Sequence, residues 1–276
     1  MTEQTGAPLT PDYSAIKQKQ NAAWSSGDYA QVGVTLQLVG ELLAEAMDLP
    51  FGAKVLDVAA GNGNVSLAMA RRGYQVTSSD YVGDLLARGQ VRAEAEGLSL
   101  TFQEADAENL PFDDGAFDGV VSTFGVMFTP NQDQSASELM RVLKAGGKIG
   151  LANWTPDGFI GQLFKTLGAF VPPPPGVQSP ARWGTQEWLE ASFGAKAAKM
   201  SITPRAFQFR YQSPEAFVDT FRAIYGPVHK AFLTLEADKQ EALTNDIIAL
   251  IGRFNSATDG SALIASDYLE VIIEKA

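Results

Sequence analysis

The sequence predicts an α/β fold with a doubly wound, mostly parallel sheet, because three features of the chain agree. From residue 54 to residue 154, short apolar runs alternate with segments of helical periodicity. Helical segments stop at glycines such as Gly73 and Gly97. The first apolar run ends in two glycines one residue apart, Gly61 and Gly63, as a sharp turn from a strand into a helix requires. Such units pair in parallel through right-handed crossovers.

The expected elements follow in chain order. We expect helices between Tyr13 and Leu49 with a break at "SSGD" (25–28), ended by Pro50 and Gly52. The core then contains strands at 54–60, 74–80, 99–106, 117–123 and 148–154, and helices at 65–73, 84–97 and 132–147, the last with a double-glycine exit.

After Trp154 the regular alternation stops. We expect helices at 159–170, 185–194, 213–226 and 236–255, strands at 199–211 and 267–276, and an extended proline-rich stretch at 171–180. The chain is therefore predicted to form one domain over 1–276. Its parts are an N-terminal helical cap (1–50), a ligand-binding core (51–155), and lid helices inserted near the closing strands (156–276).

The composition excludes several classes of function. The 276 residues include no cysteine, which excludes disulfides, thiolate metal sites and cysteine nucleophiles. The formal net charge is −11 without any run of Lys or Arg, so we expect no nucleic-acid partner and no binding to anionic membranes. Carboxylates are abundant but form no clear metal-ligand cluster. The N-terminal residues lack the pattern of a signal peptide, which favours a cytoplasmic protein with a small-molecule partner, either a monomer or a homodimer.

Glycine or aspartate follows three expected strands at the edge where open parallel sheets bind ligands. Gly61 and Gly63 would let a ligand approach the backbone, although a tight turn alone would also explain them. Asp80 ends the second strand, where a carboxylate can accept both hydroxyls of a ribose, although it also suits a helix cap. Asp106 ends the third. A dinucleotide site would place a third glycine at Ser66, and no phosphate-binding lysine loop occurs, so a nucleoside without phosphates fits best.

Four separated motifs, in order, resemble the class I S-adenosylmethionine-dependent methyltransferases. They are "VLDVAAGNGN", "VTSSD", "EADAENLPFDDGAFDGVVSTFGVMF" and "ELMRVLKAGGKIGLANW", and they cover roughly residues 50 to 155. Within the family they look most like the small-molecule group that includes ubiquinone/menaquinone C-methyltransferases. The resemblance implies a Rossmann-like fold, S-adenosylmethionine as cofactor, and methyl transfer to an O, N or C atom of a small, largely apolar or aromatic acceptor.

The resemblance also implies roles for individual residues. Asp57 would steady the glycine loop or the amino group of the cofactor, and Asp80 would hold the ribose hydroxyls. The other implied cofactor residues are Gly61 and Gly63 at the methionine and ribose, Tyr81 beside the adenine, Asp106 and Ala107 at its amino group and ring nitrogen, Ser122 and Thr123 under the methionine, and Trp24 and Tyr29 above it. Ala59 stands where the family usually has a glycine, and we expect a modest backbone shift to accommodate its methyl group.

Methyl transfer from a sulfonium mainly requires alignment and a dry site. An amine or activated carbon acceptor needs nothing more, whereas a hydroxyl usually wants a general base. His229, the only histidine, is the candidate base, although a surface or helix-start position would also explain it, and Tyr225, Tyr211 or a lid carboxylate are alternatives. The expected substrate pocket consists of Phe124, Met127, Phe128, Trp154, Trp183, Phe221 and Tyr225, for which an ordinary core position is the alternative.

Two other classes of function stay open on the sequence alone. One is a catalytically silent or non-methylating S-adenosylmethionine-binding protein, whose cofactor motifs would look the same. The other is a nicotinamide oxidoreductase, against which the glycine spacing argues.

Overall fold

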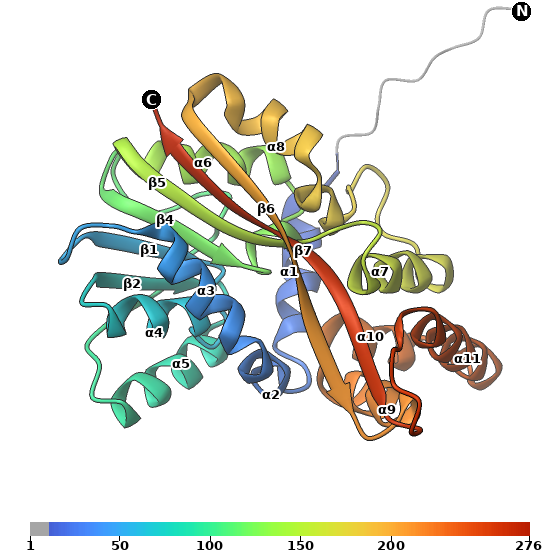
Figure 1. The fold of residues 1–276 in the computed structure, drawn as a ribbon. Coiled ribbons are helices and arrows are strands. Elements are labelled where there is room, and N and C mark those ends of the chain that lie inside the picture. The colour runs from blue at the N-terminus through green and yellow to red at the C-terminus, as the bar shows by residue number, and fades with distance from the viewer. Residues whose placement is uncertain (1–10) are drawn as a thin grey trace, which may run out of the picture.

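The computed structural model describes residues 11–276, so the first ten residues of the expected 1–50 cap lie outside it. In the described residues, seven strands form one sheet in the order β3-β2-β1-β4-β5-β7-β6 (Figure 1). The pairs β3–β2, β2–β1, β1–β4 and β4–β5 are parallel, and β7 is antiparallel to both β5 and β6. The predicted Rossmann-like, doubly wound and mostly parallel sheet is confirmed.

The strands are β1 (Lys54–Val58), β2 (Gln75–Asp80), β3 (Thr101–Glu104), β4 (Phe117–Thr123), β5 (Leu143–Trp154), β6 (Ala197–Tyr211) and β7 (Ala262–Lys275). The helices are α1 (Tyr13–Trp24), α2 (Tyr29–Gly33), α3 (Gln37–Met47), α4 (Asn64–Arg71), α5 (Gly83–Ala95), α6 (Gln132–Val142), α7 (Phe159–Phe170), α8 (Gln186–Phe193), α9 (Pro214–Ile224), α10 (Gly226–Thr234) and α11 (Ala237–Phe254).

Helices lie on both sides of the parallel strands. In Figure 1, α3, α4 and α5 gather on one side of the sheet, while α6 and α8 lie on the other. The chain winds from β1 through β2 to β3 in one direction, then returns to β4 on the other side of β1 and continues to β5. The direction of winding therefore reverses between β1 and β4, which is where open α/β sheets bind their ligands.

The two antiparallel strands at the other edge carry the added helices. The β6–β7 pairing runs from Ala197↔Lys275 to Tyr211↔Ala262. Helices α9, α10 and α11 connect β6 to β7, and α7 packs on α11 (Figure 1). A helical lid inserted near the closing strands is the arrangement that the sequence predicts.

Three predicted elements are wrong in their bounds. The helix expected at 132–147 ends at Val142, and β5 begins at Leu143 with the double glycine inside it. The β4–β5 register shifts between the pairs Phe117↔Leu143 and Gly119↔Lys148, so residues 144–147 bulge out of the ladder. The last strand begins at 262 instead of 267. The sequence analysis also missed α10, which has proline in its first turn.

Among residues 11–276, no helix is long and apolar enough to cross a membrane.

Candidate active site

A cavity that is partly open to solvent lies at the carboxyl ends of the parallel strands, where the direction of winding reverses between β1 and β4. Segments from α1, α2 and the loops after β1, β2, β3 and β4 line it. The lining residues are Lys17, Gln20, Trp24, Tyr29, Ala59, Ala60, Gly61, Asn62, Asn64, Asp80, Tyr81, Val82, Leu85, Ala105, Asp106, Ala107, Thr123, Phe124, Gly125, Phe128, Thr129 and Pro130.

The loop after β1 has a left-handed backbone at three positions. Ala59, Gly61 and Gly63 have φ angles of 54°, 56° and 83°. This conformation suits glycine but costs an alanine about 1–2 kcal/mol. The room for the methyl group of Ala59 comes from a second glycine, because a Cβ on Gly125 would lie 2.1 Å from the carbonyl oxygen of Ala59 and 2.8 Å from its Cβ. Gly125 thus compensates for the missing family glycine.

Two asparagines and an arginine hold this loop against the helices beside it. The Nδ2 of Asn62 donates to the carbonyl of Ala30 at 3.3 Å, and the Nδ2 of Asn64 donates to the carbonyl of Gly33 at 2.6 Å. From α5, Nη1 of Arg92 donates to the carbonyl of Asn62 at 2.7 Å and to Oδ1 of Asn64 at 2.9 Å. The loop is therefore fixed from two sides before any ligand binds.

Asp57 lies under the loop and does not line the cavity. Its side chain is fully buried, and its Oδ2 accepts hydrogen bonds from the backbone N–H and the hydroxyl of Ser66 at 3.1 and 2.6 Å. Its Oδ1 has no hydrogen-bond partner among the described residues. Burial raises the pKa of Asp57 to about 7 despite these bonds, and the charge of Asp80 adds to the rise. Of the two roles implied for Asp57, the geometry favours steadying the loop.

Asp80, in contrast, faces the cavity at the end of β2. Its Oδ2 accepts the N–H of Gly61 at 2.8 Å, and its Oδ1 accepts the N–H of Val82 at 2.9 Å. Burial raises its pKa to about 6, although these backbone hydrogen bonds lower it. Each carboxylate oxygen retains a second lone pair. The side chain is thus held rigidly and can still accept from two hydroxyl groups.

Asp106 reaches the cavity from the end of β3, with Ala107 beside it. Its Oδ1 accepts the N–H of Glu108 at 2.9 Å. Its Oδ2 accepts from Nζ of Lys17 at 2.6 Å, and the same Nζ lies 3.0 Å from Oε2 of Glu108. A lysine that lines the cavity is therefore neutralised by two carboxylates.

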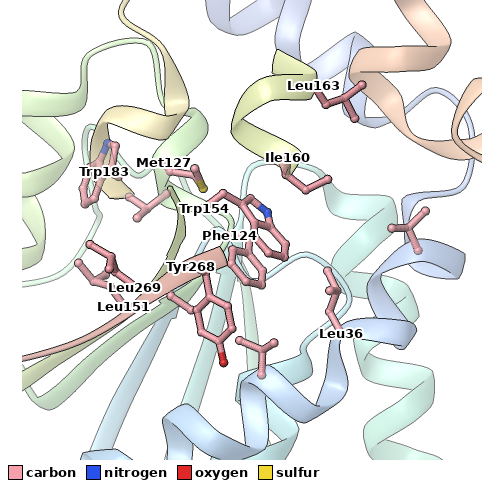
Figure 2. Close-up of a cluster of buried hydrophobic side chains, with 14 of the residues drawn as sticks. Leu36, Phe124, Met127, Leu151, Trp154, Ile160, Leu163, Trp183, Tyr268 and Leu269 are labelled. Carbon is pink, nitrogen blue, oxygen red and sulfur yellow. The ribbon is translucent and has the colours of Figure 1, made fainter. Parts of the chain in front are cut away.

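Aromatic rings form another part of the cavity wall. The ring of Trp24 packs edge-on against those of Tyr29 and Phe128, with centroid distances of 5.4 and 5.0 Å. Phe124 has a φ of 55°, and its ring stacks on Trp154 at 3.8 Å (Figure 2). Burial raises the pKa of Tyr29 to about 12, with a further contribution from Asp80, so its phenol stays protonated at neutral pH. This part of the wall is apolar.

Several predicted site residues lie outside the cavity wall. Ser122 is buried under it, where its hydroxyl donates to the carbonyl of Val58 at 2.7 Å and accepts the N–H of Val126 at 3.0 Å. His229 lies on α10 with Nδ1 2.8 Å from the carbonyl oxygen of Arg222. The other predicted residues that do not line the cavity are Asp57, Gly63, Met127, Trp154, Trp183, Phe221 and Tyr225.

The physical reason is that most of these aromatic side chains pack on other core residues. Trp183 lies 4.2 Å from the ring of Trp188, and Phe221 stacks on Phe217 at 4.0 Å. Figure 2 shows Trp183 and Met127 among buried side chains at the sheet. Trp154 and Tyr225 form a second layer behind the wall, because the ring of Trp154 stacks on Phe124 at 3.8 Å and that of Tyr225 lies 5.8 Å from Trp24.

The polar residues that α1 contributes to the cavity were not predicted from the sequence. Lys17 and Gln20 line the cavity, and they lie three residues apart on a helix whose sequence, "YSAIKQKQNAAW", shows only a weak apolar face. The spacing of these two polar residues is the feature of the sequence that could have predicted their place in the cavity. Asn62 and Asn64, within the glycine motif, were also missed as loop anchors.

In residues 11–276, no group of three or more His, Cys, Asp or Glu side chains is arranged to hold a metal ion. The polar groups that line the cavity are carboxylates, amides, hydroxyls, backbone groups and the ammonium of Lys17.

The comparisons with known proteins agree with this arrangement. A family model described as "Methyltransferase domain" matches residues 56–151. An uncharacterized protein of Mycobacterium bovis, Mb1438c, is 40% identical over 237 residues, which are 85% of this chain and 86% of the relative. Demethylmenaquinone methyltransferase of Thermus thermophilus is 33% identical over 167 residues, 58% of this chain and 76% of that enzyme. The chain belongs to the class I S-adenosylmethionine-dependent methyltransferases.

The solved structure of a Haemonchus contortus phosphoethanolamine N-methyltransferase in complex with S-adenosyl-L-methionine shares the fold of this methyltransferase. Its TM-score is 0.53 at 16% identity, over 86% of this chain and 52% of that one. The cofactor of this methyltransferase is S-adenosylmethionine, and the polar groups that line the cavity fit it. The carboxylate oxygens of Asp80 and Asp106 are able to accept from hydroxyl and amino groups. Among the described residues that line the cavity, the one cation, Lys17, is neutralised by Asp106 and Glu108.

Proposed function

We propose that this methyltransferase acts on a small, largely apolar or aromatic acceptor. The attacking atom would be an activated ring carbon or an amine nitrogen, which needs no general base to remove a proton before the attack. One observation carries the proposal: the wall formed by Trp24, Tyr29, Phe124 and Phe128 offers apolar surface and no group suited to remove a proton. Apolar pockets bind acceptors of matching character.

The absence of a suitable base argues against an unactivated hydroxyl acceptor. Among the described residues that line the cavity, the titratable ones are Lys17, Tyr29, Asp80, Tyr81 and Asp106. Lys17, Asp80 and Asp106 are engaged by backbone or ion-pair contacts. Burial raises the pKa of both Tyr29 and Tyr81, so their phenols are neutral at neutral pH. His229, which the sequence suggested as base, is not among the lining residues. An acceptor that needs no proton removal before attack therefore fits better.

We assign a role to each of these residues from its position in the cavity. When bound, the cofactor would supply an electrophilic methyl group on a sulfonium. The nucleophile of the acceptor would bond to the methyl carbon in line as the carbon–sulfur bond breaks, and S-adenosylhomocysteine would leave as a neutral thioether. We expect Asp80 to orient the ribose, and Asp106 with Ala107 to orient the adenine. The aromatic wall would exclude water and hold the acceptor on the side of Phe124 and Phe128. Alignment and water exclusion together supply up to about 7–11 kcal/mol in the best cases.

The name of the Thermus thermophilus relative suggests the first acceptors to try. We would incubate the protein with methyl-labelled cofactor and a reduced naphthoquinol, an electron-rich phenol, a secondary amine and an aliphatic alcohol. Product from the quinol, the phenol's ring carbon or the amine, but not from the alcohol, is expected. Turnover of the alcohol alone would contradict the proposal. Cofactor binding without product from any acceptor would favour the catalytically silent alternative.

Asp80→Ala serves as the control for the cofactor site in the same assay. Binding of S-adenosylhomocysteine is expected to weaken by about tenfold or more, because the carboxylate accepts hydrogen bonds as a charged group. We further propose that the enzyme is cytoplasmic and is a monomer or a homodimer. Its chain would form one domain with the parts that the sequence predicts: a cap (1–50), a core (51–155) and a lid (156–276).

A further inference from the structure

Helix α1 is attached across the cavity by three polar side chains from one face. Lys17, Gln20 and Asn21 occupy positions i, i+3 and i+4, which neighbour one another on a helix. The Nε2 of Gln20 donates to the carbonyl of Phe128 at 3.1 Å, and the Nδ2 of Asn21 donates to the carbonyl of Tyr81 at 2.7 Å. Both partners line the cavity, so α1 forms part of its roof.

The third attachment differs from the other two because it ends on a side chain. Nζ of Lys17 lies 2.6 Å from Oδ2 of Asp106 and 3.0 Å from Oε2 of Glu108, whose side chain is only 5% exposed. Oε1 of Glu108 accepts the N–H of Asn131 at 2.7 Å, which fixes the glutamate in turn. Asp106 is therefore oriented at both oxygens, by the N–H of Glu108 and by the lysine of another element.

Without the lysine, two neighbouring carboxylates would face each other with no cation between them. Asp106 is the more exposed of the two, with 36% of its side chain accessible, so repulsion would turn it away first. Its orientation toward the cavity consequently depends on α1, which lies outside the motifs that resemble the family.

We propose that Lys17 is a positioning residue that fixes the Asp106 carboxylate to accept the exocyclic amino group of the cofactor's adenine. Through this contact, the N-terminal helix takes part in recognising the base as well as in covering the site. The inference rests on S-adenosylmethionine as cofactor and on Asp106 as its adenine acceptor, and it is independent of the identity of the methyl acceptor.

Adenine recognition can be measured apart from affinity by comparing two ligands. S-adenosylhomocysteine carries the amino group, whereas its deaminated inosine counterpart carries a carbonyl oxygen at the same position. A carboxylate held at that position accepts from the amino group and repels the carbonyl. We expect the wild-type protein to prefer the adenosine ligand by about tenfold or more, the range of a hydrogen bond to a charged group.

Calorimetric titration of four variants with both ligands tests the proposal. Lys17→Met is expected to reduce the preference for adenosine at least severalfold, and Lys17→Arg to retain most of it, because arginine keeps the cation. Asn21→Ala loosens α1 without touching Asp106, so it is expected to weaken both ligands equally and leave the preference unchanged. Lys19→Met, at an exposed position of the same helix, is the matched control and should match the wild type.

The possible outcomes distinguish this proposal from a purely structural role of Lys17 and from the proposal about the methyl acceptor. If Lys17→Met weakens both ligands equally, as Asn21→Ala does, Lys17 is only a helix anchor and the proposal is overturned. An unchanged preference in Lys17→Met also overturns it. If Lys17→Met does not fold, Lys17→Gln, which removes the cation but keeps a hydrogen-bond donor, takes its place: a reduced preference for adenosine supports the proposal, and an unchanged preference overturns it. Failure of the acceptor proposal would change none of these binding ratios, whereas a wild-type protein that binds neither ligand would remove the cofactor assignment itself.

Discussion

Replacing Asp57 by asparagine is expected to flatten the dependence of the protein's stability on pH. Asp57 is fully buried without a cation, and its pKa rises from the ordinary 3.8 to about 7 on folding, chiefly because of burial. A carboxyl group with a raised pKa stabilises the folded state when protonated. Its contribution is therefore fully present below the unfolded-state pKa and is lost as the pH rises through about 7.

The magnitude follows from the size of the pKa change. A rise from 3.8 to about 7 corresponds to about 4 kcal/mol in total. Between about pH 5.5 and about pH 8, Asp57 accounts for a loss of about 2 kcal/mol. Asp80, whose pKa burial raises to about 6, adds about 1 kcal/mol over the same interval and in the same direction. The Asp57→Asn variant would keep an acceptor for Ser66 and leave only the part that Asp80 contributes.

Urea unfolding at the two pH values measures this difference as the change in the free energy of unfolding. The wild type is expected to lose about 3 kcal/mol from its Asp57 and Asp80 carboxyls, and Asp57→Asn about 1 kcal/mol. Asp246→Asn, at an exposed position of α11, is the control for removing a carboxylate without burial and should keep the wild-type slope. Equal slopes in the wild type and in Asp57→Asn would refute the reasoning.

Three further predictions concern two cavity-lining residues and the histidine that the sequence suggested as a base. Gly125→Ala is expected to cost about 3 kcal/mol and to abolish S-adenosylhomocysteine binding, because the new Cβ would meet the carbonyl oxygen of Ala59; a melting temperature equal to the wild type would contradict this. His229→Gln should leave kcat within about twofold at every pH, because catalytic bases contribute about a hundredfold or more; a loss of that size would restore the histidine as a base. Phe128→Ala should raise the KM for an apolar acceptor about tenfold while the Kd of S-adenosylhomocysteine stays within about twofold, and an effect on cofactor binding alone would count against an acceptor contact.

The cofactor half of the site was predictable because strand ends converge. Once β1, β2 and β3 are recognised as parallel neighbours, Gly61, Asp80 and Asp106 must meet at one edge of the sheet, and all three line the cavity. Their spacing along the chain carries that information directly. The same logic located Phe124, which follows β4.

The aromatic half was predicted less well because burial and pocket lining have the same signature in a sequence. Trp154 and Trp183 are as apolar as Phe128, yet one stacks behind Phe124 and the other packs on Trp188. Whether an aromatic ring reaches a cavity or fills a core depends on tertiary packing between distant elements. Periodicity along one helix or strand does not encode that choice.

The roof of the site depends on a part of the chain that the family motifs do not describe. The floor comes from the loops after the parallel strands, whereas Lys17, Trp24 and Tyr29 come from helices N-terminal to β1. A ligand enclosed by the roof and the floor must interact with two parts of the fold, and the sequences of these two parts can vary independently. On the proposal that the floor binds the cofactor, we expect differences in acceptor choice among relatives to follow the roof and the aromatic wall. Exchanging α1 and α2 between relatives would accordingly change the acceptor range more than the affinity for the cofactor's ribose, provided that a cation is kept opposite Asp106.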